Sequence, residues 1–166
     1  MRGRRAEDKS SLHLREERRM KLLQIFIAAC ATLFSIAGVP LRPVGVMGSP
    51  FGEAVPVCPD ATLIQRAEQG QGVARALGEN LAVLLQGHGA VIVGKNIEEA
   101  FVASILLEDS AVLQYRASAI GTPKPLEGEM LRRARDQVWN PKVVSKMWHY
   151  YLMKAESRGI LSEAPR

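Results

Sequence analysis

Two short runs of branched apolar residues, separated by one glycine-flanked turn, constrain the fold of this chain more than any other feature. Residues 82–85 and 90–93 contain no polar side chain, and Gln86-Gly87-His88-Gly89 lies between them. Apolar runs of this length without alternation are typical of strands that are covered on both faces. Because the connection is so short, antiparallel pairing is favoured. The sequence therefore predicts a buried hairpin with a tight turn at His88.

The turn itself has two interpretations. Glycines on both sides of His88 let the backbone turn sharply and let a ligand or a metal ion approach without obstruction. A neutral imidazole on a rigid turn is also a good donor to a divalent ion. The spacing alone, however, favours a structural turn whose histidine bonds a backbone carbonyl. The Gly-His-Gly triplet therefore marks a candidate site without identifying its chemistry.

The clearest helix is expected after this hairpin. Asn96 can cap its first turn and Glu99 can return a bond to the backbone, as in a capping box, while Gly121 supplies the stop. The residues that fall on its predicted apolar stripe are Phe101, Ile105, Val112 and Tyr115.

Shorter elements are predicted on either side. An edge strand is expected at residues 55–57, followed by a helix that starts after Asp60 and stops at Gly78. After a connector at residues 122–128, one helix is expected over residues 129–138. A last helix has Asn140 as its cap and Pro141 in its first turn, and Gly159 ends it. Its broad apolar face needs burial against the domain or against another subunit.

The apolar stretch 22–39 also has two interpretations. It follows a basic run, so a signal anchor is one of them. Gln24, Thr32 and Ser35 interrupt the stretch, and its length is marginal for crossing a bilayer. A buried helix rich in small residues is therefore favoured. Residues 1–21 are charged on all sides and are expected to be disordered in isolation.

The net charge of +5 does not by itself indicate a nucleic-acid partner. Residues 1–21 hold eight Lys or Arg and four Asp or Glu, which accounts for +4 of it. The other 145 residues hold 14 basic and 13 acidic side chains and are nearly neutral. Because neutralising phosphates needs a clustered basic surface, nucleic-acid binding is not expected.

The other histidines and the cysteines have ordinary interpretations. His13 is expected on a solvated helix face of the charged N-terminal segment. His149 adjoins Trp148 on the last helix, where packing in the core or in an interface is expected. Cys30 and Cys58 have no spacing that suggests zinc or redox chemistry. Both are expected to be buried thiols in a reducing compartment.

A longer stretch of the sequence resembles a known family. Residues 84–94, followed by residues 97–101 and 106–109, closely resemble the late signature of the class II aldolase/adducin family. The resemblance extends back through residues 31–41 and covers roughly residues 29–157. It is therefore much more specific than the Gly-His-Gly triplet.

The resemblance implies a three-layer α/β/α class II aldolase-like domain with a central, largely antiparallel sheet that is incomplete at its N-terminus. Residues 29–166 would form this partial domain, and residues 1–28 would be an out-of-pattern basic and apolar segment. In the family a zinc-type ion is held by three histidines, and His88 corresponds to the third. Ile25 and Ile27 stand where the first two normally form a His-x-His pair.

Two explanations fit this departure from the family pattern. Residues 1–28 could come from a truncated or frame-shifted gene model rather than from the natural start of the domain. Alternatively, the chain is a degenerate member that keeps the scaffold for assembly, as adducin-type relatives do. Isoleucine has no donor atom, and a single imidazole with waters cannot hold zinc tightly.

The function that the resemblance implies is carbon–carbon bond cleavage by a metal-dependent lyase. The expected type is an aldehyde-lyase or a hydroxy-acid decarboxylase, and the sequence Met147-Trp148-His149-Tyr150-Tyr151 resembles members of the second kind. The expected cofactor is a divalent metal, zinc, that stabilises an enediolate-like anion. The expected partners are a small hydroxy-carbonyl or sugar-like substrate and further copies of the chain in a homotetramer, in the cytoplasm. No catalytic acid or base is identified. The alternative is a non-catalytic, adducin-like scaffold subunit.

Overall fold

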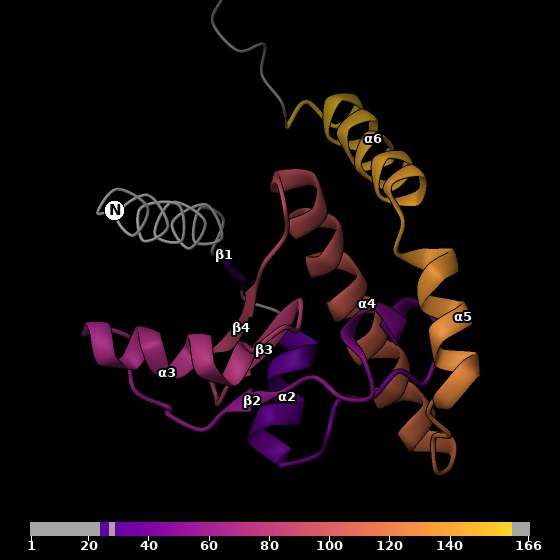
Figure 1. Cartoon of the computed structure of the whole chain (residues 1–166). Helices are drawn as coiled ribbons and strands as arrows, with labels where there is room; N and C mark the ends of the chain where they lie inside the picture. The colour runs from indigo at the N-terminus through magenta and orange to yellow at the C-terminus, as the bar shows by residue number, and fades with distance from the viewer. Residues whose placement is uncertain (1–23, 27–28, 161–166) are drawn as a thin grey trace, which may run out of the picture.

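The computed structural model describes residues 24–26 and 29–160, and its centre is a mixed four-stranded sheet (Figure 1). The strand order is β1-β4-β3-β2. Strand β3 pairs antiparallel with β4, β4 pairs antiparallel with β1, and β2 pairs parallel with β3. The strands are β1 (Gln24–Phe26), β2 (Val57–Cys58), β3 (Ala82–Leu85) and β4 (Gly89–Ile92). The predicted hairpin is therefore confirmed, and it forms the middle of the sheet.

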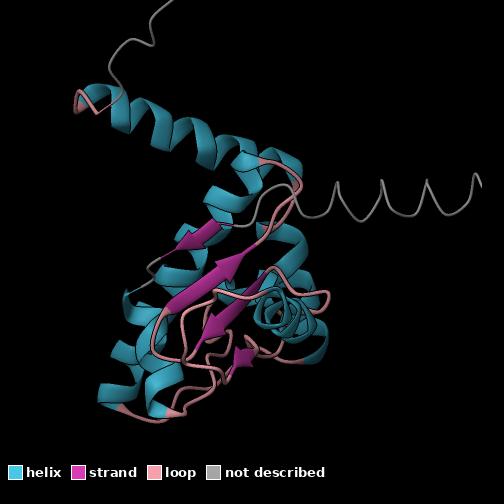
Figure 2. Cartoon of the chain, turned by 90° about the vertical axis from the view of Figure 1, so that its left-hand side faces the viewer, coloured by secondary structure: helices cyan, strands magenta, loops and turns pink. Residues whose placement is uncertain are grey.

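Both faces of the β3–β4 hairpin are covered, as its unbroken apolar pattern predicts. Successive side chains of a strand point to opposite faces. Leu84 and Ile92 accordingly pack into a large core with helices α2 and α4, whereas Val83 and Val91 pack into a smaller core under α3. Figure 2 shows the strands running between helices on both sides. The fold is thus the three-layer α/β/α arrangement that the sequence predicts.

Helix α4 (Ile97–Ile120) begins and ends where its signals predict. The Asn96 side chain accepts a bond from the Glu99 backbone N–H at 2.8 Å, and the helix stops before Gly121. The Glu99 carboxylate bonds the Lys95 N–H at 2.9 Å, one residue earlier than a regular capping box would have it. The N-terminal half of α4 packs against α2 and β4 and supplies much of the larger core.

The predicted apolar stripe of α4 is wrong in part. Tyr115 is 59% exposed, and Phe101 is only partly buried. The face that packs against the sheet instead combines two leucines with several small residues. Small residues let the helix approach its neighbours closely, so the buried face follows them rather than the largest side chains. Its most deeply buried members are Val102, Ala103, Leu106, Leu107 and Ala111.

The apolar stretch near the N-terminus is not one buried helix. It divides into strand β1 and helix α2 (Ala29–Ala37), which has Ala31, Phe34 and Ser35 buried. Ile36 on the opposite side of α2 is 60% exposed. No helix within the described ranges is long and apolar enough to cross a membrane.

The remaining elements match their predictions with shifted boundaries. Helix α3 (Ala67–Leu77) starts later than predicted, because Asp60 bonds Thr62 within its own loop instead of capping a helix. The edge strand β2 likewise starts two residues after the predicted one. Three further elements complete the fold: the 3₁₀ helix η1 (Val46–Phe51), α5 (Gly128–Val138) and α6 (Pro141–Ser157).

Helix α6 lies at the edge of the molecule in both views (Figures 1 and 2). Asn140 caps it by accepting the Val143 N–H at 3.1 Å, and Pro141 occupies its first turn, as predicted. Trp148 and Tyr151 pack edge-on against Phe101 of α4, with ring centroids 5.4 and 5.5 Å apart. Only part of the apolar face of α6 is covered in this way.

The start of α2 is capped by a side chain from a distant part of the chain. Glu108 of α4 accepts bonds from the backbone N–H groups of Cys30, at 2.8 Å, and Ala31, at 3.2 Å. A carboxylate is well suited to this place because the first N–H groups of a helix lack partners within it and carry positive partial charge. The pKa of the nearby Cys30 thiol is raised, first by its burial and then by the Glu108 carboxylate.

We expect the Glu108 cap to contribute measurably to stability. Glu108→Ala removes both acceptors and should lower the free energy of unfolding by about 1–2 kcal/mol, whereas Glu108→Gln should cost about half as much. Urea denaturation followed by circular dichroism measures both. Asp109→Asn, an exposed neighbour on the same helix, serves as the control and should change stability by less than about 0.5 kcal/mol. Equal effects at the two positions would rule out the cap.

Candidate functional site

His88 lies on the turn between β3 and β4, which its two glycines make possible. Gly87 has φ 71° and Gly89 has φ 136°, values that side chains other than hydrogen rarely allow. The backbone N–H of His88 closes the turn on the Leu85 carbonyl at 3.0 Å. The turn is therefore rigid, and it presents the His88 side chain to solvent.

The orientation of the His88 ring leaves one nitrogen available. Nδ1 lies 3.3 Å from the Gln86 carbonyl oxygen. Because a carbonyl only accepts hydrogen bonds, Nδ1 must carry the proton in this contact. Nε2 then keeps its lone pair in the neutral ring and can accept a bond or bind a metal. A backbone carbonyl bonded to the far nitrogen is a common way to orient a metal-binding histidine. The same geometry therefore fits both a structural turn, whose histidine bonds a backbone carbonyl, and a histidine that binds a ligand or a metal ion.

A buried serine supports this turn from the neighbouring helix. Ser35 of α2 is 4% exposed, and its hydroxyl accepts the Gly87 backbone N–H at 3.2 Å. The same hydroxyl donates to the Thr32 carbonyl at 2.8 Å, which fixes its direction. Ser35 thereby ties the turn that carries His88 to helix α2. The sequence interpretation missed this role, because Ser35 counted there only as an interruption of an apolar stretch.

The positions of the missing histidines lie on or next to β1. The register pairs Ile25 with Val91 and Phe26 with Ala90, so β1 runs along the strand that leaves the His88 turn. Ile27 lies outside the described residues. Within the described ranges no three His, Cys, Asp or Glu side chains come together to hold a metal ion. The predicted zinc site is therefore represented by His88 alone in the part of the chain that the structure describes.

A pocket of about 300 Å³ opens beside His88, between the β3–β4 turn and the segment that joins β2 to α3. We refer to it as the His88 pocket. Its lining residues come from β2, the β2–α3 connection, α3, β3 and the turn: Cys58, Asp60, Thr62, Leu63, Ile64, Gln65, Gln69, Val73, Leu85 and His88. The described ring thus faces an open cavity, as a ligand-binding histidine requires.

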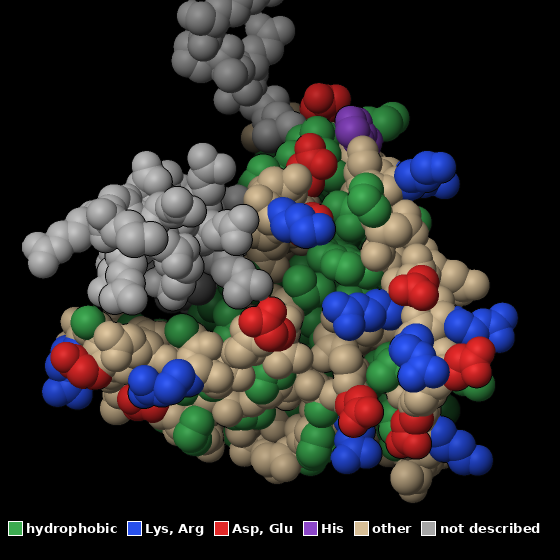
Figure 3. All heavy atoms as spheres, viewed as in Figure 1, with side chains coloured by type: hydrophobic (Ala, Val, Ile, Leu, Met, Phe, Trp, Pro, Cys, Tyr) green, Lys and Arg blue, Asp and Glu red, His purple; other side chains and the backbone are tan. Residues whose placement is uncertain are grey.

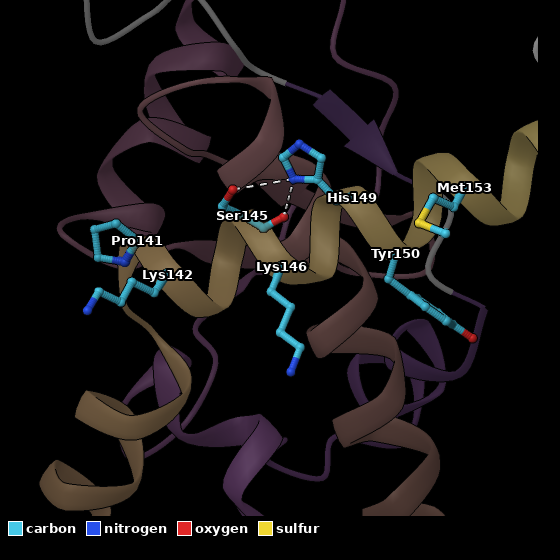
Figure 4. Close-up of a pocket in the computed structure, with 7 residues that line it drawn as sticks. All are labelled: Pro141, Lys142, Ser145, Lys146, His149, Tyr150 and Met153. Atoms are coloured by element: carbon cyan, nitrogen blue, oxygen red, sulfur yellow. Dashed lines mark hydrogen bonds between the residues drawn. The ribbon is translucent and has the colours of Figure 1, made fainter.

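His149 takes no part in this site. It lies on α6 and is exposed in the single chain, so packing in the core is wrong, whereas packing in an interface stays a prediction. Its Nδ1 lies 2.7 Å from the Ser145 carbonyl oxygen and 3.4 Å from the Ser145 hydroxyl (Figure 4). Because the shorter contact uses Nδ1 as a donor, that nitrogen is not available as a base for the hydroxyl. The surrounding hollow is lined by residues 141–153 of this one helix. His13 lies outside the described residues.

Both cysteines have little exposed surface, and charges of both signs are mixed on one face of the molecule. Cys30 is partly buried and Cys58 is buried, and both thiols are free. On the face shown in Figure 3, Lys and Arg side chains alternate with Asp and Glu around an apolar centre. That face shows no clustered basic surface of the kind that nucleic acids need.

Comparison with known sequences decides the family. The family described as "Class II Aldolase and Adducin N-terminal domain" matches residues 27–115, which include α2, the central hairpin, His88 and most of α4. The chain belongs to the class II aldolase/adducin family. The resemblance that the sequence carries is therefore confirmed.

Two curated proteins of Streptomyces are similar to this class II aldolase/adducin chain. One is "4-hydroxy-3-prenylphenylpyruvate oxygenase/4-hydroxy-3-prenylbenzoate synthase" of Streptomyces roseochromogenus subsp. oscitans, 31% identical over 106 residues, or 63% of this chain. The other is "Decarboxylase NovR" of Streptomyces niveus, 32% identical over 100 residues, or 60% of this chain. The matches cover 38% and 37% of these relatives, so the family member described here corresponds to well under half of their length.

Solved structures of the family share the fold. An aldolase II superfamily protein from Pseudomonas syringae matches 90% of this chain and 61% of its own, with a TM-score of 0.71 at 18% sequence identity. At this identity the likeness concerns the arrangement of helices and strands alone. It supports the three-layer architecture independently of the residues at the site.

We expect Ser35 to keep the His88 turn in place. Ser35→Ala leaves the Gly87 N–H without its side-chain partner and should cost about 1–2 kcal/mol of stability. Hydrogen exchange of the Gly87 amide, measured by NMR, should become faster. Ser118→Ala is the matched control, because the exposed Ser118 hydroxyl makes a similar helical bond to the Gln114 carbonyl at 2.9 Å, far from the turn in sequence. Unchanged exchange at Gly87 in the Ser35 variant would contradict the role.

Proposed function

We propose that this chain is a lyase of the class II aldolase type, which cleaves a carbon–carbon bond in a small hydroxy-carbonyl or hydroxy-acid compound. The observation that carries the proposal is the His88 turn: a rigid bend inside the family region that holds an imidazole at the mouth of a pocket, with Nε2 available. A ring held in this way can bind a divalent ion or a polar group of a substrate.

The described donors alone do not fit a tightly bound metal. Zinc in a catalytic site normally has three protein ligands, and His88 supplies one. Ile25, at one of the two other expected positions, has no donor atom. We propose that a divalent metal, zinc in the first place, binds here only when further ligands come from outside the described residues. No chemical step through a metal follows from this donor set.

The substrate type is suggested by the relatives. The two Streptomyces proteins are named for a 4-hydroxy-3-prenylphenylpyruvate oxygenase and a decarboxylase, and they cover the part of this chain that contains His88. We therefore place decarboxylation or cleavage of a hydroxy acid before aldol cleavage of a sugar. Residues 29–166 would form a class II aldolase-type domain to whose sheet β1 adds a strand. It would act in the cytoplasm as a homotetramer in carbohydrate or hydroxy-acid metabolism.

A second function is favoured by one specific observation. Isoleucine at positions 25 and 27 removes two of the three histidines that the family uses, which suits a subunit that keeps the scaffold without the chemistry. The partly uncovered apolar face of α6, where Tyr150 is 58% and Met153 69% exposed, would then serve assembly.

Metal content and activity separate the two functions. The full chain is purified with zinc supplied and incubated with 4-hydroxy-3-prenylphenylpyruvate, and product formation is followed by mass spectrometry. A lyase should hold about one ion per chain and release product, and it should lose both with a chelator. Metal far below one ion per chain together with no product would favour the scaffold.

Restoring the missing histidines tests the position of the site. The family forms its His-x-His pair at the positions of Ile25 and Ile27, and Ile25 pairs with Val91 of β4, so Ile25→His with Ile27→His should supply the two ligands that His88 lacks. The double variant should bind zinc at least about a hundredfold more tightly than the native chain, measured by competition with a chelating dye.

Two controls make this result specific to His88. Adding His88→Ala to the double variant should abolish the gain, because the third ligand is removed. His149→Ala in the same background should leave the gain unchanged, because His149 lies on α6, outside the site. A gain that survives the loss of His88 would place the metal elsewhere.

A further inference from the structure

The His88 pocket has an apolar floor. Cys58 of β2, Val73 of α3 and Leu85 of β3 line it and are each only 5–6% exposed. All three belong to the smaller core under α3, so the floor is rigid. Leu63 and Ile64 add apolar surface at the opening, where they are 64% and 39% exposed. Part of any ligand in this pocket must therefore be apolar.

The polar side of the pocket is pre-arranged by a chain of hydrogen bonds. The Asp60 carboxylate accepts the Thr62 N–H at 2.9 Å and the Thr62 hydroxyl at 2.6 Å. The Thr62 hydroxyl in turn accepts a bond from the Gln69 amide at 2.8 Å. These contacts orient the carboxylate before any ligand arrives, so little ordering would be needed on binding.

The charge in the pocket is negative. The two bonds from Thr62 lower the pKa of Asp60, which is ionised at neutral pH. No Lys or Arg is among the described residues that line the pocket. Arg66 lies close enough to contribute a smaller part of that pKa shift but does not line the pocket.

Two backbone donors just before α3 do not compensate for this. The N–H groups of Gln65 and Arg66 both donate to the Gln69 side-chain oxygen, at 3.0 and 3.1 Å. A helix start can bind phosphate when its N–H groups are available, and these two are already used. A phosphate placed in the pocket would therefore meet a carboxylate, with no Lys or Arg among the described lining residues and without these two donors to balance its charge.

Asp60 and His88 together present acceptors. The carboxylate accepts hydrogen bonds, and so does Nε2 of His88 when Nδ1 donates to the Gln86 carbonyl. A ligand that matches both must offer hydrogen-bond donors. The volume of about 300 Å³ is at the lower end for small-molecule sites and suits a molecule of about one ring.

We propose that the His88 pocket binds the non-reacting part of the substrate. This part is an apolar body ending in a hydroxyl or an ammonium group that donates to Asp60. Phosphorylated compounds are excluded from the pocket. The inference rests on the proposed function only in calling the ligand a substrate. The binding itself requires neither a metal nor turnover. Asp60 is thus assigned as a specificity-determining residue.

Three probes with one apolar body test the assignment. Benzylamine, benzyl alcohol and benzyl phosphate are titrated separately into the full ¹⁵N-labelled chain with a chelator present, and amide shifts are followed by NMR. Benzylamine and benzyl alcohol should shift the amides of residues 58, 60–69, 85 and 88 in a saturable way. Benzylamine should bind about threefold to fivefold more tightly than benzyl alcohol, because its charge meets an exposed carboxylate. Benzyl phosphate should produce no saturable shift there.

Asp60→Asn isolates the contribution of the charge. Asparagine keeps the shape and can still accept the bonds from Thr62, so the pocket should stay formed. The advantage of benzylamine over benzyl alcohol should disappear, whereas Asp136→Asn, the same change at an exposed position of α5, should leave it intact. The spectra without ligand report whether each variant is folded.

The possible failures are distinguishable. Shifts confined to other parts of the chain, no saturable shift with any of the three probes, or benzyl phosphate binding as well as benzylamine would each overturn the inference. None of these results depends on zinc or product formation, which test the proposed function separately. If the chain binds benzylamine through Asp60 but never releases product, the pocket assignment is supported and the proposed lyase function is contradicted.

Discussion

The burial of both faces of the β3–β4 hairpin is the constraint on which the rest of the structure depends. Its side chains alternate between a larger core under α2 and α4 and a smaller core under α3, so neither layer of helices can be removed without exposing one face. The position of the turn at its end is fixed because both strands that lead into it are packed in these cores. This is why a single exposed histidine can have a defined direction, and why the pocket beside it has a rigid floor.

The fold was largely predictable because its signals are local. Asn96 and Asn140 mark helix starts because their side chains accept nearby backbone N–H groups, and Gly121 directly follows the end of α4. The hairpin follows from its apolar runs. The errors arose where tertiary contacts decide. An apolar stretch can form a strand or a helix, and only pairing with β4 selects the strand at β1. The buried face of α4 follows small residues that pack closely, which a search for large apolar side chains does not detect.

The candidate site was predictable only at His88, where flanking glycines and family likeness coincide. Its supporting residues gave no local signal. Ser35 and Asp60 are a serine within an apolar stretch and an acid before a helix, and both patterns have commoner explanations. Their roles depend on residues brought together by the fold: the Gly87 amide is 52 positions from Ser35, and the His88 ring comes from a different element from Asp60. Spacing along a sequence cannot show this convergence.

The Glu108 cap has a consequence for how the chain acquires its structure. The carboxylate lies 78 positions after the Cys30 amide that it binds, so during synthesis α2 leaves the ribosome long before its acceptor exists. Contacts between such distant positions form slowly because a long loop must close first. Helix α2 and the β1 strand before it are therefore expected to fold last. A nascent chain that stops before α4 would expose the apolar surface on which chaperones act.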